Sequence, residues 1–173
     1  RSIRQFTERR PSRAQIEQLI EAACWAPSNH NRQGWKFIVF EDANTIRDLA
    51  RRVRASVREH AANSNATAAA HLDEIIHYAG LFENAPVVLL AMHKPGPAVG
   101  QKVLESACST LASGEALSTA MAVQNLCLMA HALGLGACVM TAPLLAGEVW
   151  HGLPDLPAGF EPTCLVALGY PAH

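Results

Sequence analysis

The first regular pattern of apolar residues predicts a helix between Ser12 and Pro27. Apolar side chains recur at i, i+3, i+4 and i+7 and form one face, made of Ile16, Leu19, Ile20 and Ala23. Ser12 with Gln15 three residues later is the pattern of a capping box. Pro27 disfavours a helical conformation in the residue before it, so the helix is expected to end there.

The remaining apolar patterns predict alternating helices and strands. Strands are predicted at residues 35–41, 85–92, 136–141 and 163–168. Helices are predicted from about residue 44, near 72–79, at 115–133 and near 146–152. Residues 61–70 lack large apolar groups and predict a surface loop or a weak helix. Alternation of this kind favours a parallel sheet by default.

The predicted helix at 115–133 has no charged residue after Glu115. A helix that is apolar all round is usually buried. We therefore expect it to be covered on nearly every side, either in the centre of the domain or in a dimer interface. Gly134 is suited to end it in the left-handed conformation.

The composition is that of one globular domain, residues 1–173. Half of the residues are hydrophobic, which is enough for a core, but no uninterrupted apolar run is long enough to span a membrane. The first residues contain no apolar segment typical of a signal peptide. Five cysteines without CxxC spacing predict free thiols and a cytoplasmic location. The scattered histidines predict no metal site.

Positive charge is concentrated in the N-terminal third. Residues 1–58 hold eleven arginines and Lys36 against six acids, whereas the remainder holds two lysines against nine acids. An anionic ligand should therefore be bound mainly by the N-terminal part. Several of these arginines, from Arg47 to Arg58, have helical spacing, which is typical of a solvated helix face and predicts no nucleic-acid partner.

The loop from Pro27 to Trp35 is dense in amide, hydroxyl and guanidinium groups. Such groups between a helix and a strand can bind a polar heterocycle, but they also occur in an ordinary connecting loop. The usual phosphate-binding motifs GxGxxG and GxxxxGK[ST] are missing. A cofactor site would have to be built in another way.

Five short motifs, in order and spread over nearly the whole chain, make the sequence similar to the FMN-dependent nitroreductase family. They are Arg1-Ser2-Ile3-Arg4, Ala26-Pro27-Ser28 with Asn31-x-Gln33-x-Trp35, Gln124-Asn125-Leu126, Gly134-Leu135-Gly136 and Leu168-Gly169-Tyr170-Pro171. The resemblance implies an α+β fold with a mostly antiparallel central sheet flanked by helices. It also implies a domain-interlocked homodimer with two FMN sites at the interface, and it replaces the parallel sheet as our expectation.

The resemblance assigns cofactor-binding residues in three groups. Arg1 and Arg4, with Ser2 as their hydroxyl partner, match the residues that bind the FMN phosphate and the pyrimidine edge. The loop that the partner subunit lays over the flavin, including an amide for its polar edge, matches Pro27, Ser28, Asn29, Asn31 and Gln33. Positions near the reactive flavin N5 match Gly136, Met140 and Thr141. Trp35 is expected in the core, and His30 and Arg32 have no fixed role, so either could face the substrate.

Three departures from the family pattern bear on these assignments. Gly34 replaces a common proline, which should loosen the loop. Thr141-Ala142 stands where some members have Glu-Gly. No basic residue follows the Gly-Tyr-Pro turn in the given sequence, where the family often completes its phosphate site.

The function implied by the resemblance is that of an oxidoreductase with FMN as cofactor and NADH or NADPH as electron donor. Hydride transfer to the flavin followed by reduction of a nitroaromatic, quinone or similar small molecule would give ping-pong kinetics. The chemistry belongs to the cofactor, so no catalytic acid or base is assigned. The alternatives are other flavin chemistry, such as ring dehydrogenation, dehalogenation or flavin breakdown, and a non-catalytic flavin-binding protein. We expect the acceptor pocket to involve residues 61–70 and 94–112.

Overall fold

The computed structural model describes residues 1–62, 70–96 and 114–172. Its four strands are β1 (Trp35–Phe40), β2 (Val87–His93), β3 (Gly136–Met140) and β4 (Glu161–Gly169). Its α-helices are α1 (Arg13–Cys24), α2 (Ala43–Ala62), α4 (Leu72–Ala79), α6 (Gly114–Ala132) and α7 (Gly147–His151). Two short 3₁₀ helices are η1 (Asn29–Asn31) and η2 (Ala142–Leu145). The predicted loop at 61–70 and most of the predicted acceptor pocket lie outside the described residues.

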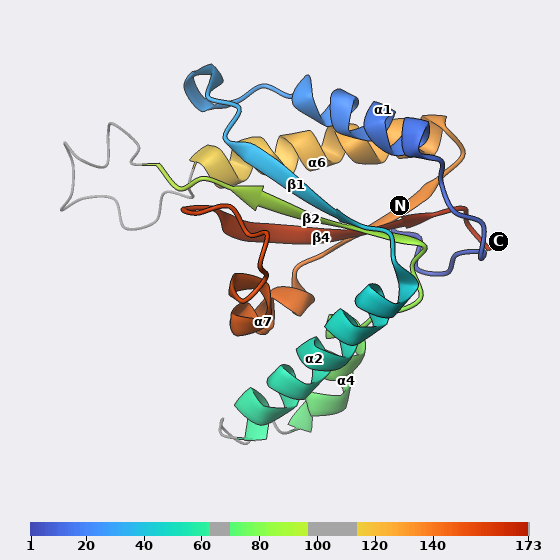
Figure 1. Cartoon of the computed structure of the whole chain (residues 1–173), viewed down its shortest axis with the longest axis vertical. Coiled ribbons are helices and arrows are strands. Elements are labelled where there is room, and N and C mark those ends of the chain that lie inside the picture. The colour runs from blue at the N-terminus through green and yellow to red at the C-terminus, as the bar shows by residue number, and fades with distance from the viewer. Residues whose placement is uncertain (63–69, 97–113, 173) are drawn as a thin grey trace.

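The four strands form one sheet in the order β1-β2-β4-β3, and every pair in it is antiparallel. The parallel sheet favoured by simple alternation is therefore wrong, and the antiparallel sheet implied by the family resemblance is confirmed. The alternation of helices and strands does not predict the strand direction here, because two helices, α2 and α4, follow β1 in the chain before β2 begins. They extend away from the sheet as a pair (Figure 1). The two strands that they connect then pair in opposite directions.

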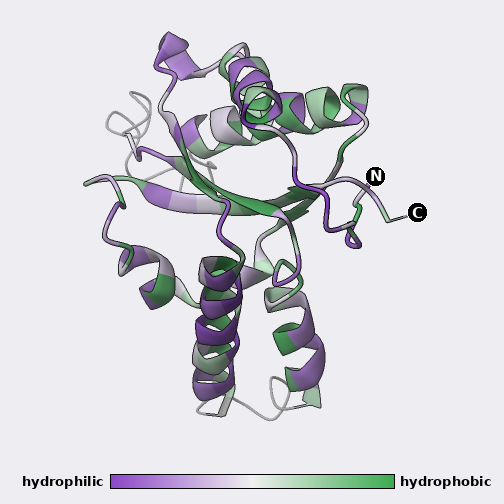
Figure 2. Cartoon of the chain, turned by 45° about the vertical axis from the view of Figure 1, so that its right-hand side comes forward, coloured by the Kyte–Doolittle hydropathy of each residue, from purple (hydrophilic) through white to green (hydrophobic). Residues whose placement is uncertain are grey.

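Helices cover both faces of the sheet (Figure 1). α1 and α6 pack on one face around a core that includes Leu19, Leu126 and Val166. α2, α4 and α7 cover the other face around Ile46, Phe82 and Trp150. Figure 2 shows the apolar strands between these helical layers, which is why most of β2 and β4 is buried.

The boundaries of α1 confirm the prediction from the capping box. Ser12 accepts a hydrogen bond from the backbone of Gln15, and the Gln15 side chain accepts one from the backbone of Ser12. The predicted apolar face is buried at Ile16, Leu19 and Ala23. Trp35 is also in the core, as expected.

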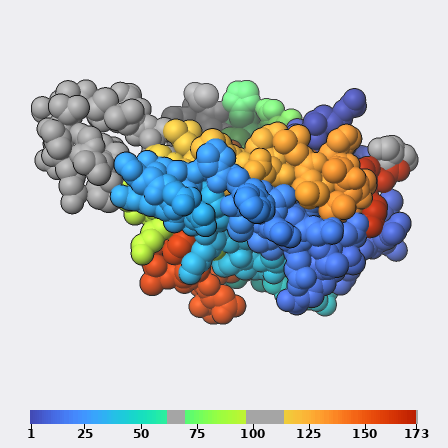
Figure 3. Space-filling model, turned by 90° about the horizontal axis from the view of Figure 1, so that it is seen from above, coloured from blue at the N-terminus to red at the C-terminus, as the bar shows by residue number. Residues whose placement is uncertain are grey.

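Only one side of α6 is buried in the described chain. Ala122, Val123, Leu126 and Ala130 face the sheet, whereas Leu117, Met121 and Leu128 are 54%, 41% and 59% exposed. The expectation of burial on nearly every side is thus wrong for the single chain, because α1 and the sheet cover only its inner faces. The outer side of α6 forms a long strip of the surface in Figure 3. No helix among the described residues is both long and apolar enough to cross a membrane.

Candidate functional site

The N-terminal segment lies along β3, at one edge of the sheet. The backbone N–H of Ile3 donates a hydrogen bond of 2.9 Å to the carbonyl oxygen of Ala137. Gly136 allows this approach, since a Cβ added there would lie 2.7 Å from the side chain of Ile3. Further along, Phe6 pairs with Pro171. The segment is thereby fixed between β3 and the C-terminal end of the described chain.

A cleft of about 650 Å³ lies where this segment, β3 and the C-terminal half of α6 meet. It is lined by Arg1, Ser2, Ile3, Gln124, Cys127, Leu128, His131, Leu135, Gly136, Ala137, Val139 and Pro171. Arg1 and Ser2 are exposed there, and within the described residues neither side chain has a hydrogen-bond or ion-pair partner. The cleft therefore combines an apolar floor with a cation and a hydroxyl that are available to a ligand.

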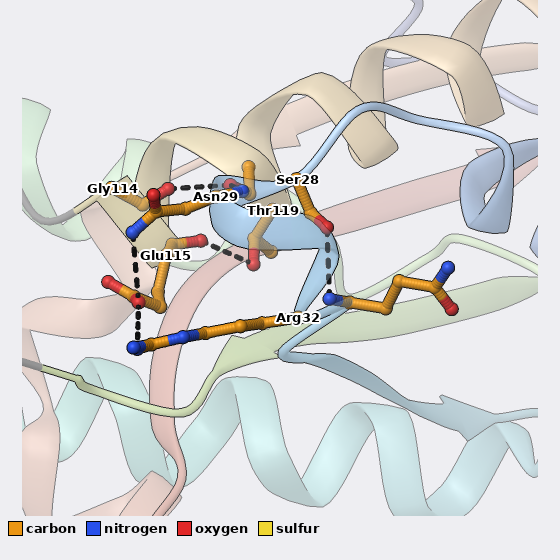
Figure 4. Close-up of polar contacts among 8 residues, drawn as sticks. Ser28, Asn29, Arg32, Gly114, Glu115 and Thr119 are labelled. Carbon is orange, nitrogen blue, oxygen red and sulfur yellow. Dashed lines mark hydrogen bonds and ion pairs between the residues drawn. The ribbon is translucent and has the colours of Figure 1, made fainter.

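The polar loop that follows α1 lies at the opposite end of α6 (Figure 1). The backbone N–H of Asn29 donates to Ser118 Oγ at 3.0 Å. The Asn29 side-chain amide donates to Glu115 Oε1 at 3.3 Å, and Arg32 Nη1 donates to the same oxygen at 2.9 Å. Figure 4 shows these residues converging on the first turn of α6. The loop is thus held by the helix N-terminus of its own subunit.

Three residues of this loop have a left-handed backbone although none is glycine. The φ angles are 51° at His30, 52° at Asn31 and 47° at Gln33. Non-glycine residues rarely adopt this conformation, and they tend to cluster at binding sites when they do. Gly34, by contrast, has no positive φ, and a Cβ added there would meet only an atom of Glu115 at 3.9 Å. The unusual backbone of the loop is therefore not carried by its glycine.

The residues predicted to bind the cofactor fall into separate places in one chain. Arg1, Ser2 and Gly136 line the cleft, whereas the predicted loop residues lie beyond the other end of α6. Arg4 lines a neighbouring surface depression with Ser2, Ile3 and Gln5. Met140 is buried and Thr141 is exposed at the end of β3, and neither lines the cleft. Arg32, left without a role by sequence reasoning, is ion-paired to Glu115.

Sequence reasoning missed the residues that α6 contributes to both places. The cleft side chains of α6 are Gln124, Cys127, Leu128 and His131, whose spacing of three and four residues could have marked one helix face. Glu115 and Ser118 hold the loop, and the signal for Glu115 was that it is the last charge before a long uncharged run.

Cys127 and Cys164 are poor nucleophiles in this environment. Burial raises the pKa of Cys127, which lines the cleft, and raises the pKa of Cys164 to about 12. Both therefore stay protonated near neutral pH, and they offer no thiolate for covalent chemistry. Cys108 lies outside the described residues. Among the residues that the structure describes, no group of acidic, histidine or cysteine side chains is arranged to hold a metal ion.

The antiparallel α+β fold is shared with proteins of known structure. The crystal structure of a BluB-like flavoprotein from Clostridium difficile 630 superposes with a TM-score of 0.85 at 23% identity, covering 99% of this chain and 86% of that one. A nitroreductase with bound FMN from Bacteroides fragilis superposes with a TM-score of 0.73 at 20% identity, covering 99% and 84%. At these identities the likeness establishes the fold.

Sequence comparison goes further than the fold. Residues 1–170 match the Nitroreductase family. A Thermus thermophilus protein named NADH dehydrogenase is 31% identical over 182 aligned residues, which cover all of this chain and 83% of that protein. The chain therefore belongs to the nitroreductase family, as its motifs indicated.

Proposed function

We propose that this chain is an FMN-dependent oxidoreductase that takes hydride from NADH or NADPH and reduces a small electron-poor acceptor, such as a nitroaromatic compound or a quinone. Membership of the nitroreductase family supports the enzyme class, the flavin and the nicotinamide donor. The observation that carries the proposal for this chain is the cleft beside α6, with its available Arg1 and Ser2.

The residues of the cleft fit FMN in charge, shape and polarity. The guanidinium of Arg1 can donate two hydrogen bonds to a phosphate, and the hydroxyl of Ser2 can donate another. Gly136 and Ala137 add little side-chain bulk on the β3 side of the cleft, which leaves room for a ligand, while Leu128 and Leu135 provide apolar surface for a planar ring. When bound, FMN supplies hydride transfer at its ring, and the chain's own task is to orient it and exclude water.

We propose further that the working unit is a homodimer in which α6 pairs antiparallel with its copy. The outward side of α6 carries a stripe at intervals of four, three, four and three residues, formed by Leu117, Met121, Gln124, Leu128 and His131. Such spacing is typical of a helix-packing seam. Gln124 is at its centre, so a two-fold axis there would pair Leu117 with the partner's His131 end and Met121 with the partner's Leu128. The last three residues of the stripe also line the cleft, so the proposed seam borders the FMN site.

This arrangement would complete each cleft with the loop of the other subunit. Glu115, which holds the loop, lies nine residues before Gln124 and sixteen before His131, the two ends of the α6 side of the cleft, so that the cleft begins about 14 Å and ends about 24 Å further along the helix. No residue of the loop is among those that line the cleft of the same chain. Antiparallel pairing of α6 reverses the partner, so that its loop meets this chain's cleft.

Titration of the purified protein with FMN, followed by anaerobic mixing with NADH or NADPH, tests the function. We expect a bound flavin whose visible absorbance bleaches with either nucleotide and returns when a quinone or nitroaromatic compound is added. Bound flavin that neither nucleotide reduces would overturn the proposed electron donor and favour the other flavin chemistries. A protein that binds no FMN would overturn the proposal as a whole.

A further inference from the structure

The loop between α1 and β1 has a backbone that its own sequence does not favour. His30, Asn31 and Gln33 all have φ near +50°. The left-handed conformation is unfavourable for residues with a Cβ, although asparagine tolerates it better than most. A loop with three such residues in four positions keeps its shape only where the surrounding structure holds it. Its local hydrogen bonds include one from the Gln33 backbone N–H to Ser28 Oγ at 3.0 Å.

Glu115 is the central contact between this loop and the rest of the subunit. Its side chain is only 3% exposed, and Oε1 accepts hydrogen bonds from Arg32 at 2.9 Å and from Asn29 at 3.3 Å. Backbone on the far side encloses the pair, since a Cβ added at Gly96 would lie 2.7 Å from Arg32 Nη1. The carboxylate also lies in the first turn of α6, where the helix dipole favours negative charge.

This contact holds the loop at two residues, Asn29 and Arg32, and the three residues with positive φ lie between these anchors or directly after the second. Asn29 precedes His30 and Asn31, Arg32 separates them from Gln33, and both Asn29 and Arg32 are bonded to Glu115. Ser118 adds a bond to the Asn29 backbone from the next turn of α6. The exposed tip residues thus have their positions determined by a buried carboxylate that they do not themselves contact.

We infer that Glu115 is a positioning residue for the FMN site of the partner subunit: through Arg32 and Asn29 it holds the strained loop in the conformation that presents Asn31 and Gln33 to the flavin. The inference rests on the proposed function and refines its residue roles. Because the Asn29 side-chain amide donates to Glu115, Asn29 serves as an anchor of the loop. The exposed amides of Asn31 and Gln33 are joined by a hydrogen bond of 3.2 Å from Gln33 Nε2 to Asn31 Oδ1, which leaves the Asn31 side-chain N–H groups and the Gln33 side-chain oxygen to face a cofactor.

The experiment compares Glu115→Ala and Glu115→Gln with Glu17→Ala as a matched control. Glu17 also forms an ion pair with an arginine at 2.9 Å, but it is exposed on α1 and distant from the loop contacts. Glutamine keeps an oxygen that can accept from Asn29 and removes the charge that attracts Arg32. We would measure the dissociation constant for FMN by flavin fluorescence, the backbone hydrogen exchange of residues 28–34 without FMN, and the unfolding temperature.

We expect Glu115→Ala to raise the dissociation constant for FMN about tenfold or more, Glu115→Gln to raise it less, and Glu17→Ala to leave it unchanged. In the protein without FMN, exchange at the Asn29 and Gln33 amides should speed up in Glu115→Ala while exchange in β2 and β4 stays as in the wild type. Adding Arg32→Ala to Glu115→Ala should cause little further loss of FMN affinity, because either change alone already removes the ion pair between Arg32 and Glu115.

A folded Glu115→Ala protein with wild-type FMN affinity would overturn the positioning role and leave the proposed function standing. Equal acceleration of exchange throughout the protein would also overturn it, since that result describes general destabilisation. If Glu115→Ala does not fold, Glu115→Gln decides the same question. A wild-type protein that binds no FMN would overturn the proposed function and this role together.

Discussion

The two ends of α6 hold polar groups in opposite ways. At the C-terminal end, Arg1 and Ser2 stand at an open cleft with no side-chain partner among the described residues. At the N-terminal end, Glu115, Arg32 and Asn29 bond one another under cover of neighbouring backbone. The first arrangement leaves donors for a ligand, and the second uses donors to fix a shape. In the proposed dimer, each site would combine the open cleft of one subunit with the fixed loop of the other.

The largest effect should come from a charge on the outward side of α6. It would prevent the proposed pairing of α6 with its copy and so separate the cleft of one subunit from the loop of the other. Met121→Glu should give a folded monomer with little FMN affinity, since an unpaired carboxylate would be buried in the α6 pairing. Met121 does not line the cleft, so a loss of FMN affinity would follow from the loss of the dimer. Leu145→Glu is the control, because Leu145 is an apolar residue of η2 that is 58% exposed, against 41% for Met121. Light scattering and FMN titration would measure both; a dimeric Met121→Glu protein would contradict the proposed interface.

Removing the positive charge of Arg1 from the cleft should weaken FMN binding without affecting dimer formation. We expect Arg1→Ala to cost about 1.5–3 kcal/mol of FMN binding, the value of a charge-assisted hydrogen bond, or roughly 10-fold to 150-fold in affinity. Arg13→Ala removes the same charge from an exposed position on α1 and should change little. Calorimetric titration would compare them, and equal effects of the two changes would show that Arg1 acts only through net charge.

A mixed dimer tests whether the cleft of one subunit works with the loop of the other subunit or with the loop of its own chain. If one protomer carries Arg1→Ala and the other Glu115→Ala, pairing between subunits puts both defects in one site and leaves the other site intact. About half of the sites should then bind FMN with wild-type affinity. Action within each subunit would instead leave no intact site. Protomers with two different affinity tags would allow the mixed dimer to be purified and titrated.

The rate at which Cys127 is alkylated measures whether the cleft is occupied. Burial raises its pKa, so at a given pH less of it is thiolate than of an ordinary thiol, and its alkylation should keep accelerating with pH beyond the ordinary thiol range. FMN should slow this alkylation several-fold because Cys127 lines the cleft. Exposed Cys24 is the internal control and should be unaffected by FMN. Peptide mass spectrometry after timed alkylation would detect both.

The smallest effect should come from a substitution at Gly34, at the end of the loop that Glu115 holds. Because Gly34 has no positive φ and space for a Cβ, Gly34→Ala should change stability and FMN affinity by no more than about 0.5 kcal/mol. Thermal unfolding and FMN titration would measure the change. A large loss would mean that the loop depends on the absence of a side chain at this position.

Local features of the fold could be predicted from the sequence because local residues determine them. The capping box at Ser12 and the four strands lie where their patterns placed them, within a few residues at each end. The direction in which the strands pair could not be predicted in this way. No local pattern distinguishes a helical pair that leaves the sheet, as α2 and α4 do, from a helix that crosses over it. The antiparallel sheet was therefore predicted only through the family resemblance.

The same limit applies to the candidate site. The motifs predicted Arg1, Ser2 and Gly136, and the structure brings these three to one cleft. The Arg32–Glu115 pair joins residues 83 positions apart, and nothing near either residue announces the other. The left-handed backbone at His30 and Gln33 could not be predicted either, because the sequence cue for that conformation is glycine, and Gly34 does not adopt it. The assignments of Arg4, Met140 and Thr141 stay predictions.

The hydrogen bond between Ile3 and Ala137 has a consequence for solubility. β3 is the last strand of the sheet, and an uncovered last strand presents backbone groups to which another chain can add. The segment that carries Arg1 occupies part of that row, so it shields the sheet from strand addition while it presents a cation to the cleft. Loss of residues 1–5 would therefore expose β3 and favour aggregation.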